Sequence, residues 1–372
     1  MRVTTVVGTR PEIIRLSRII PALDAAFKHT LIHTGQNDAP ELSQVFFDEM
    51  CIRKPDLHLN TTEHRTLRRN TPMETMGAML DRLDSDFKLN RPDAVLILGD
   101  TNSCFASAYA AKRNRVPLFH MEAGNRSFDD RVPEEINRRM IDHIADINMP
   151  YSAIARENLL NEGLASERII RTGSPLAEVL HHYKRDISRS GVLQRLGLQK
   201  DKYFVVSCHR EENLNDHYSD FIGMLMMLAS HGYRVIVSTH PRTLNRLGTL
   251  QPPALIEFHK PFGFFDYIAL QQNARATLSD SGTITEESSI LKFPALNLRD
   301  THERPEGMEE GAVMLTGFNT ARIEEALNIL SLHKGTLTRV PQDYRVPNIS
   351  ETVVRIILSH VDVINRNVWR KA

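Results

Sequence analysis

The chain has few cysteines, no net charge and no long apolar run. Three cysteines occur in 372 residues, Cys51, Cys104 and Cys208, and they lie far apart without a Cys-x-x-Cys pair. This spacing indicates neither a zinc site nor a disulfide framework, and it suits a reducing compartment. Basic and acidic residues number 46 each, so the net charge is zero. A neutral chain argues against nucleic acid or an anionic membrane as the main partner, and we expect a small ligand.

The longest apolar run, around residues 221–229, is far too short to span a bilayer. No apolar signal region precedes the first predicted strand, and no internal repeat or low-complexity segment is present. We therefore expect a soluble cytoplasmic protein without a membrane partner. With 372 residues and ordinary apolar content, the chain is too long for one core of usual size and predicts two globular domains.

What the chain does have is a regular alternation of short apolar runs with helical segments. The predicted strands lie at 3–7, 30–34, 94–99, 116–121, 147–150, 203–208, 234–239, 255–258, 276–278 and 294–298. Such alternation predicts parallel sheets with helices on both faces, which bind ligands at the carboxyl ends of the strands. The charged helical stretch 173–201 is the predicted linker, and an amphipathic helix is expected at about 350–369.

The stretch 276–291 reads as strand, tight turn and helix, with Asp280-Ser281-Gly282-Thr283 at the turn. Backbone N–H groups and the helix dipole would favour a diphosphate there, although Asp-Ser-Gly is also an ordinary turn. Two acids, Glu286 and Glu287, follow in the first turn of the helix. They suit the helix dipole, and a carboxylate there can also accept hydrogen bonds from ribose hydroxyls.

A second predicted anion site follows the first strand, where a helix opens with Pro11. Arg10 falls in the turn and Arg15 about one turn into the helix, so both guanidinium groups could point at a charged ligand group. The alternative is that Arg15 and Arg18 form a solvated helix face. Arg304, beside a proline after the last predicted strand, is another candidate anion clamp.

Acidic residues directly follow two predicted buried strands, as Asp100 and Glu122. A carboxylate at this position is costly unless it is paired or exposed in a cleft, so both are candidate site residues. For Asp100 the alternative is capping of the helix that starts near Asn102.

The predicted helix from Pro133 carries two acid–base pairs. Glu135 and Arg139 are expected to pair on the outside, whereas Glu134 and Arg138 share a face that could line the cleft.

Two histidines, His209 and His240, follow corresponding strands in the second half of the chain. A lone histidine is more often satisfied within a core, but two at corresponding strand ends favour a cleft. No His-x-x-x-His or similar spacing accompanies them, so we expect no metal.

Together these motifs resemble the non-hydrolysing UDP-N-acetylglucosamine 2-epimerase family. They occur in family order at 8–12, 33–36, 99–101, 122–124, 133–138, 209–211, 280–287 and 299–306. The resemblance implies an α/β, GT-B-like fold, in which two Rossmann-like doubly wound parallel-sheet domains face a central cleft. It implies domains at 1–175 and 176–350, with a C-terminal helix, 351–372, that returns to the first domain.

The resemblance also implies roles for individual residues. The expected catalytic groups are Asp100, Glu122, Glu134 and His209. The expected substrate and UDP contacts are Arg10, Arg15, Arg138, His240, Ser281, Gly282, Thr283, Glu287 and Arg304. No cofactor is expected, and the family suggests a homodimer.

Several positions depart from the main branch of the family. Arg15 stands where that branch has lysine, Thr283 where a second glycine is usual, and Ser207-Cys208 where Thr-Gly is usual. The stretches 10–17, 120–125 and 282–289 instead resemble the capsule and O-antigen branch that makes UDP-N-acetyl-L-fucosamine. Residues 37–39 after Gln36 also differ from the allosteric motif of the main branch.

The expected reaction is inversion at C2 of a UDP-2-acetamido sugar. Elimination of UDP and its re-addition would achieve this without a redox cofactor, and the carboxylates supply the pool of bases. The expected conversion is UDP-2-acetamido-2,6-dideoxy-L-talose to UDP-N-acetyl-L-fucosamine, and the alternative is UDP-N-acetylglucosamine to UDP-N-acetylmannosamine. From other classes, a GT-B glycosyltransferase and a non-catalytic nucleotide-sugar binding module stay open.

Overall fold

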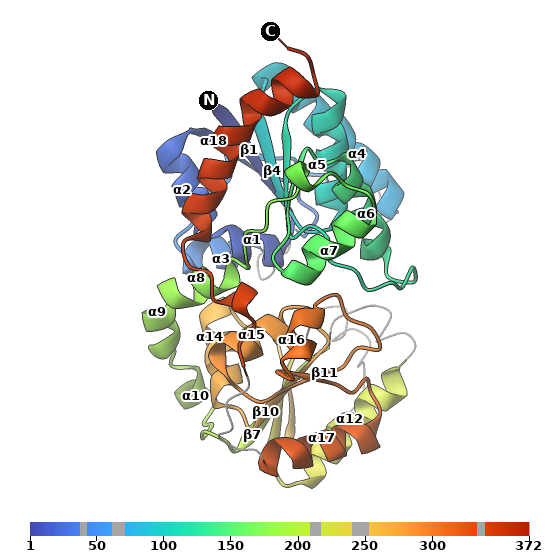
Figure 1. Ribbon diagram of the computed structural model, residues 1–372. Helices are drawn as coiled ribbons and strands as arrows, with labels where there is room; N and C mark the ends of the chain where they lie inside the picture. The colour runs from blue at the N-terminus through green and yellow to red at the C-terminus, as the bar shows by residue number, and fades with distance from the viewer. Residues whose placement is uncertain (38–42, 62–70, 209–216, 240–252, 333–338, 372) are drawn as a thin grey trace. The chain divides into compact units, whose positions relative to one another are not determined.

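The computed structural model describes residues 1–37, 43–61, 71–208, 217–239, 253–332 and 339–371. The chain divides into two compact units, one made of Met1–His181 with Arg345–Ala372 and the other of His182–Tyr344. Each unit is a parallel sheet flanked by helices (Figure 1). The predicted α/β fold with two parallel sheets is confirmed.

The sheet of the first unit has six parallel strands in the order β3-β2-β1-β4-β5-β6. Its strands are β1 (Arg2–Val7), β2 (Lys28–His33), β3 (Leu57–His58), β4 (Ala94–Leu98), β5 (Leu118–Met121) and β6 (Ile147–Met149). Its helices are α1 (Arg10–Leu16), α2 (Ile19–Ala26), α3 (Gln44–Glu49), α4 (Pro72–Asn90), α5 (Asn102–Arg113), α6 (Pro133–Ile144), α7 (Ala153–Asn161), α8 (Leu176–His182) and α18 (Ile349–Asn367), with a short 3-10 turn, Ser166–Arg168.

The second unit has a sheet in the order β12-β11-β10-β7-β8-β9. Its strands are β7 (Tyr203–Ser207), β8 (Arg234–Ser238), β9 (Ile256–His259), β10 (Ala276–Ser279), β11 (Ala295–Asn297) and β12 (Met314–Leu315). Its helices are α9 (Lys184–Ser188), α10 (Val192–Arg195), α12 (Tyr218–Ser230), α14 (Phe264–Asn273), α15 (Ile284–Leu291), α16 (Pro305–Glu309) and α17 (Thr320–Leu332), with a 3-10 turn at Gln342–Tyr344.

Both sheets have the same topology when their strands are counted within the unit. In each, the first and fourth strands pair at the centre, and the strand order reverses there: β1 with β4, and β7 with β10. This reversal is the switch point at which doubly wound sheets bind ligands, outside the carboxyl ends of the strands. The loops after β1, β4, β7 and β10 are therefore the positions where a site is expected.

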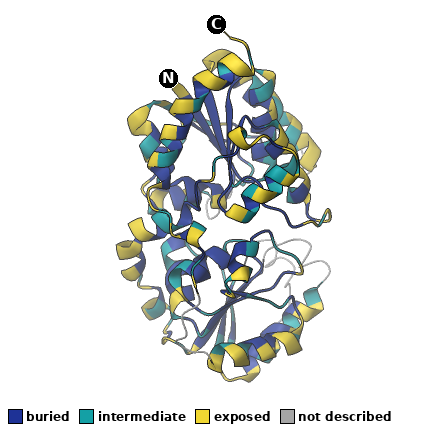
Figure 2. Ribbon diagram, viewed as in Figure 1, coloured by how far each residue is buried: buried dark blue, intermediate teal, exposed yellow. Residues whose placement is uncertain are grey.

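The central strands are buried on both faces, as parallel strands covered by helices require (Figure 2). The core of the first unit includes Val6, Val95 and Ile97 from adjoining strands. That of the second unit is built around Val206, Leu278 and helix α12. Such continuous apolar strands account for the predictions from short apolar runs.

Helix α18 lies beside α2 in the first unit (Figure 1). Its buried side chains include Val353, Ile357, Val361 and Ile364, which repeat at helical spacing along one face. Near its start, Ser350 donates through its N–H and its hydroxyl to the Glu178 carboxylate, at 2.9 and 2.5 Å. The C-terminal helix thus belongs to the first unit.

The predicted strands occur with ends shifted by a few residues, but β3 and β12 were not predicted. Each has two residues, too short to show any period. The predicted linker at 173–201 is largely structured, because α9 and α10 pack against α14 of the second unit. The division between the units falls between His181 and His182, and again between Tyr344 and Arg345.

Among the described residues, no helix is both long and apolar enough to cross a bilayer. Cys51, Cys104 and Cys208 are all free thiols.

Candidate active site

A buried carboxylate shapes the loop after β1. Glu12 Oε2 accepts hydrogen bonds from the N–H groups of Gly8 and Thr9 at 2.5 and 2.9 Å. Its Oε1 accepts from Thr101 Oγ1 at 2.7 Å, which ties this loop to the one after β4. Burial raises the pKa of Glu12, although these hydrogen bonds act in the opposite direction. The result is a fixed N-terminus for α1, from which Arg10 projects half-buried.

Arg15 is buried, with only 1% of its surface exposed. Its Nη1 lies 3.6 Å from Glu122 Oε2, and its guanidinium carbon lies 5.5 Å from the centroid of the Tyr151 ring. The alternative of a solvated helix face is therefore wrong for Arg15. The contact brings a predicted anion-binding arginine together with a predicted catalytic carboxylate.

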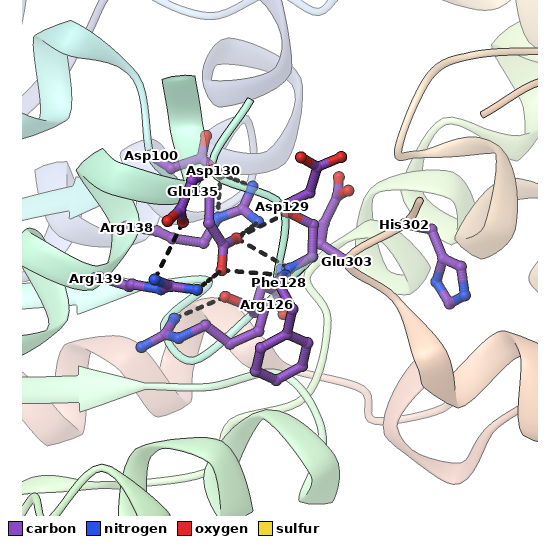
Figure 3. Close-up of polar contacts among 12 residues, drawn as sticks. Asp100, Arg126, Phe128, Asp129, Asp130, Glu135, Arg138, Arg139, His302 and Glu303 are labelled. Atoms are coloured by element: carbon purple, nitrogen blue, oxygen red, sulfur yellow. Dashed lines mark hydrogen bonds and ion pairs between the residues drawn. The ribbon is translucent and has the colours of Figure 1, made fainter. Parts of the chain in front are cut away.

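Asp100, at the end of β4, is held by α6 (Figure 3). Arg138 donates to Asp100 Oδ2 through Nε at 3.0 Å and Nη2 at 2.6 Å. The helix after β4 is capped by Thr101, whose Oγ1 accepts from the Cys104 N–H at 3.2 Å. Capping by Asp100 is thus wrong. The Asp100 side chain retains 24% exposure despite its pairing, so one face of it stays accessible.

The position of Glu135 differs from the expectation that it lies on the outside of α6. Glu135 pairs with Arg139 at 3.0 Å, but it is fully buried rather than on the outside. It also accepts from Arg138 Nη1 at 2.7 Å and from the N–H groups of Ser127 and Phe128 (Figure 3). Burial acts to raise the pKa of Glu135, but the contacts with Ser127 and the two arginines outweigh it and lower the pKa. Glu135 therefore anchors the loop before α6.

Glu134 lies next to it, half-buried, at the first turn of α6. Glu122 follows β5 in a left-handed backbone conformation, with φ of 67°. Such a conformation costs a non-glycine residue about 1–3 kcal/mol and persists where the surroundings enforce it. The Glu122 side chain is 13% exposed. The first unit thus presents Asp100, Glu122 and Arg15 at the carboxyl edge of its sheet.

In the second unit, the loop after β10 forms the predicted tight turn. Ser281 Oγ lies 3.0 Å from Thr283 Oγ1 and accepts from the Thr283 N–H at 3.4 Å. Thr283 is the N-cap residue of α15. A Cβ at Gly282 would lie 2.4 Å from Glu303 Oε1, so a larger residue would collide with that carboxylate. Glu303 is itself fixed by an ion pair with Arg299.

The acids in the first turn of α15 are buried. Glu286 lies 3.2 Å from Arg304 Nη1, and Glu287 accepts from Gln271 Nε2 at 2.8 Å. Arg304 is 3% exposed. The structure therefore brings Arg304 to the N-terminal end of α15 in the second unit.

Glu306 lies two residues after Arg304, in the first turn of α16, and accepts a hydrogen bond from the Tyr344 hydroxyl at 2.7 Å. Burial raises the pKa of Glu306, although the Arg304 charge acts against this. The predicted residues His209 and His240 lie outside the described residues. Within the described part of the chain, no group of three or more His, Cys, Asp or Glu side chains is arranged to hold a metal ion.

The sequence interpretation assigned no supporting role to Glu12, Glu135, His120 and Asp142, which are buried and hold the loops of the first unit. One signal was available, because Glu135, Arg138 and Asp142 recur at i, i+3 and i+7 on α6. Charged residues on one helical face usually indicate solvent, but here that face also carries the buried Ile141.

Two doubly wound parallel sheets, one with carboxylates and arginines at its carboxyl edge, define a GT-B-like α/β enzyme. A family model described as UDP-N-acetylglucosamine 2-epimerase matches residues 22–358. The chain therefore belongs to this family and is an isomerase, a nucleotide-sugar 2-epimerase.

Solved structures and curated relatives that are similar to this chain are also named as 2-epimerases of UDP-sugars. A structure of UDP-N-acetylglucosamine 2-epimerase from Rickettsia bellii is 46% identical, covers 100% of both chains and has a TM-score of 0.90. The Methanocaldococcus jannaschii UDP-GlcNAc 2-epimerase in complex with UDP-GlcNAc and UDP is 32% identical, with 96% and 100% of the chains covered and a TM-score of 0.88. The UDP-2,3-diacetamido-2,3-dideoxy-D-glucuronate 2-epimerase of Pseudomonas aeruginosa is 31% identical, covering 88% of this chain and 91% of the relative.

Proposed function

We propose that this protein inverts C2 of a UDP-2-acetamido sugar by eliminating UDP and adding it back. The observation that carries the proposal is the pair of carboxylates, Asp100 and Glu122, at the ends of adjacent strands of the first sheet. C2 of such a sugar carries no acidifying carbonyl, so simple deprotonation and reprotonation would be slow. Departure of UDP as the proton leaves provides a lower barrier.

The proposed reaction needs no redox cofactor, because no atom undergoes a net change of oxidation state. A carboxylate takes the proton from C2, the C–H electrons form the C1–C2 double bond, and the C1–O bond breaks with its electrons leaving on UDP. The intermediate is a 2-acetamidoglycal. UDP then adds back to C1 while a second group delivers a proton to the opposite face of C2, and the centre is inverted.

In this proposal the first unit acts on the sugar. Asp100, Glu122 and Glu134 are the pool of acids and bases, and two of them would serve opposite faces of C2. Arg138 orients Asp100 through two hydrogen bonds to one oxygen, which leaves the other oxygen for substrate. Arg15, 3.6 Å from Glu122, would stabilise negative charge as the diphosphate departs.

The second unit is assigned to UDP. The N-terminal end of α15, with Ser281, Gly282 and Thr283, offers a helix dipole for the phosphates, and Arg304 adds a guanidinium. Glu287 remains a candidate acceptor for ribose hydroxyls. His209 and His240 are proposed contacts from the sequence alone. The bound UDP of the M. jannaschii relative supports a UDP site in this family.

Two sugars are candidates. The departures at Arg15, Cys208 and Thr283 favour UDP-2-acetamido-2,6-dideoxy-L-talose, with UDP-N-acetyl-L-fucosamine as product for capsule or O-antigen synthesis. The names of the relatives favour UDP-N-acetylglucosamine instead. A pocket built for the 6-methyl group rejects an added hydroxyl only modestly, so some activity on the gluco sugar is expected in either case.

A side-by-side measurement of kcat/KM for the two UDP-sugars decides between them. The 6-deoxy-L proposal predicts the larger specificity constant for the L-talo compound. An equal or larger constant for UDP-N-acetylglucosamine would show that the substrate is the gluco sugar and leave the epimerase chemistry intact.

A further inference from the structure

A buried ion pair lies behind the loops that carry Asp100 and Glu122. His120 on β5 and Asp142 on α6 are both fully buried, and His120 Nδ1 lies 3.0 Å from Asp142 Oδ1. Neither residue is among those expected to touch substrate.

The neighbours of the His120 ring settle its protonation. Nε2 lies 2.9 Å from the Gly99 carbonyl oxygen, which can only accept a hydrogen bond, so Nε2 must donate. Nδ1 faces the Asp142 carboxylate and, at 3.4 Å, Asn148 Oδ1. The Asn148 amide nitrogen donates to the Asp142 carbonyl at 2.8 Å, so its oxygen is the atom turned to the ring. Both ring nitrogens therefore donate, and His120 is an imidazolium.

Asp142 has further partners that complete the cluster. Its carboxylate accepts from the Gly124 N–H at 3.1 and 3.3 Å and from Arg126 Nη1 at 2.7 Å. Arg126 in turn pairs with Glu162 at 2.6 Å. A buried charge is tolerated when it is paired and hydrogen-bonded in this way, whereas loss of one partner leaves the other uncompensated.

The His120–Asp142 pair contacts both loops that carry the proposed catalytic acids: His120 contacts the Gly99 carbonyl, and Asp142 contacts the Gly124 N–H. The Gly99 carbonyl belongs to the peptide that links Gly99 to Asp100, and Gly124 lies two residues after Glu122. Both loops need left-handed backbone, with φ of 91° at Gly99, 67° at Glu122 and 78° at Gly124. Glycine adopts this backbone readily, but at Glu122 it costs about 1–3 kcal/mol and persists only when the surroundings over-determine it.

We propose that His120 and Asp142 are positioning residues that hold Asp100 and Glu122 in a fixed mutual geometry for proton transfer at C2. This inference rests on the proposed function of the two carboxylates. A displacement of about 1 Å at a reacting group can lower a rate by roughly a hundredfold, so the pair acts on turnover without touching the sugar.

The test compares the purified wild-type protein with Asp142→Asn and His120→Gln. Both substitutions keep the approximate volume and remove the charge pair. We expect kcat to fall by about 10- to 100-fold, while KM and UDP affinity change by less than about twofold. His120→Gln leaves the contact between Asp142 and Arg126 in place, so it reports on positioning even where Asp142→Asn fails to fold.

Asp146→Asn is the matched control. Asp146 is also a buried acid and follows the same helix, but it accepts from Lys112 Nζ at 2.5 Å and from the Leu118 N–H at 2.9 Å, at the start of β5. The Asp146→Asn substitution should lower the melting temperature and leave kcat unchanged. A kcat loss in His120→Gln no larger than in Asp146→Asn would overturn the inference. Normal turnover in Asp100→Asn and Glu122→Gln would instead overturn the carboxylate assignment, and the inference with it.

Discussion

Asp100 and Glu122 end neighbouring strands, and each lies close to an arginine, Arg138 for Asp100 and Arg15 for Glu122. If they transfer the C2 proton, Asp100→Asn and Glu122→Gln should each lower turnover by roughly a hundredfold or more, because the amide cannot act as a base. Steady-state rates, with circular dichroism as a check on folding, measure this. Glu157→Gln, an exposed residue of α7, is the control and should keep full activity. Wild-type turnover in both carboxylate variants would remove them from the chemistry.

Arg304 is buried against Glu286 at the N-terminal end of α15. If it binds the diphosphate, Arg304→Ala should weaken UDP binding by about 1.5–3 kcal/mol, since a charge-assisted hydrogen bond to phosphate is lost. Isothermal calorimetry with UDP gives the difference. Arg322→Ala, which removes an exposed guanidinium from α17, should leave the affinity unchanged. Equal affinity of Arg304→Ala and wild type would place Arg304 outside the UDP site.

The protonation of His120 has a consequence for stability. Burial lowers the pKa of His120, but the hydrogen bond and charge of Asp142, with Gly99 and Asn148, outweigh it and raise the pKa above the ordinary value of 6.5. The stabilisation by the imidazolium is therefore complete below this ordinary value and is lost as pH rises through the raised value.

Urea unfolding of wild type and His120→Gln at about pH 6 and about pH 9 tests this. The gap in the free energy of unfolding between the two proteins should shrink at the higher pH. Subtraction of the variant cancels the titration of groups that do not interact with His120. A gap that is constant or grows with pH would show that His120 is neutral in the fold.

At the residue scale, the sequence pattern indicated candidate acids that follow strands, but not the buried side chains that support their loops. Asp100 and Glu122 were predicted because an acid after an apolar run is conspicuous. Glu135 and His120 were not assigned a supporting role, because their partners Ser127, Asp142 and the Gly99 carbonyl come from separate stretches of the chain. Such partnerships depend on tertiary packing, which a linear pattern does not contain.

Among the elements, α18 shows how a terminal helix is held. Ile357 is fully buried and its neighbour Leu358 is 61% exposed. Ile357→Ala should lower the free energy of unfolding by about 2–5 kcal/mol through lost burial and the resulting cavity. Denaturant unfolding of Ile357→Ala and of the control Leu358→Ala measures the difference. Leu358→Ala should change stability by less than about 0.5 kcal/mol. Equal losses would mean that the helix does not pack through the face seen here.

Long elements were predictable and very short ones were not. The amphipathic period of α18 and the apolar runs of β4 and β7 each span several residues, so the pattern indicates both type and position. The two-residue strands β3 and β12 form only because β2 and β11 present free edges to them. The alternative that Asp100 caps α5 is wrong because the adjacent Thr101 is the cap, and the sequence could not separate them since both residue types are good caps.

For the whole molecule, alternation of strands and helices predicted two parallel sheets, and the sheets have the same strand order. The units divide after His181 and after Tyr344, a few residues from the expected boundaries at 175 and 350, and the C-terminal helix lies in the first unit. Topology alone makes the carboxyl edges the candidate ligand sites. The proposed choice of the L-talo sugar rests on a few departures from the main branch of the family, such as Arg15 and Thr283, and the fold pattern does not test it.

Incubation of the purified protein with each UDP-2-acetamido sugar in deuterated water, followed by NMR at C2, tests the central claim most directly. Because removal and return of the C2 proton involve exchangeable carboxyl groups, the account predicts deuterium at C2 of the epimer, with inverted configuration. Epimerisation with full retention of the original hydrogen at C2 would contradict the proposed proton transfer through these carboxylates.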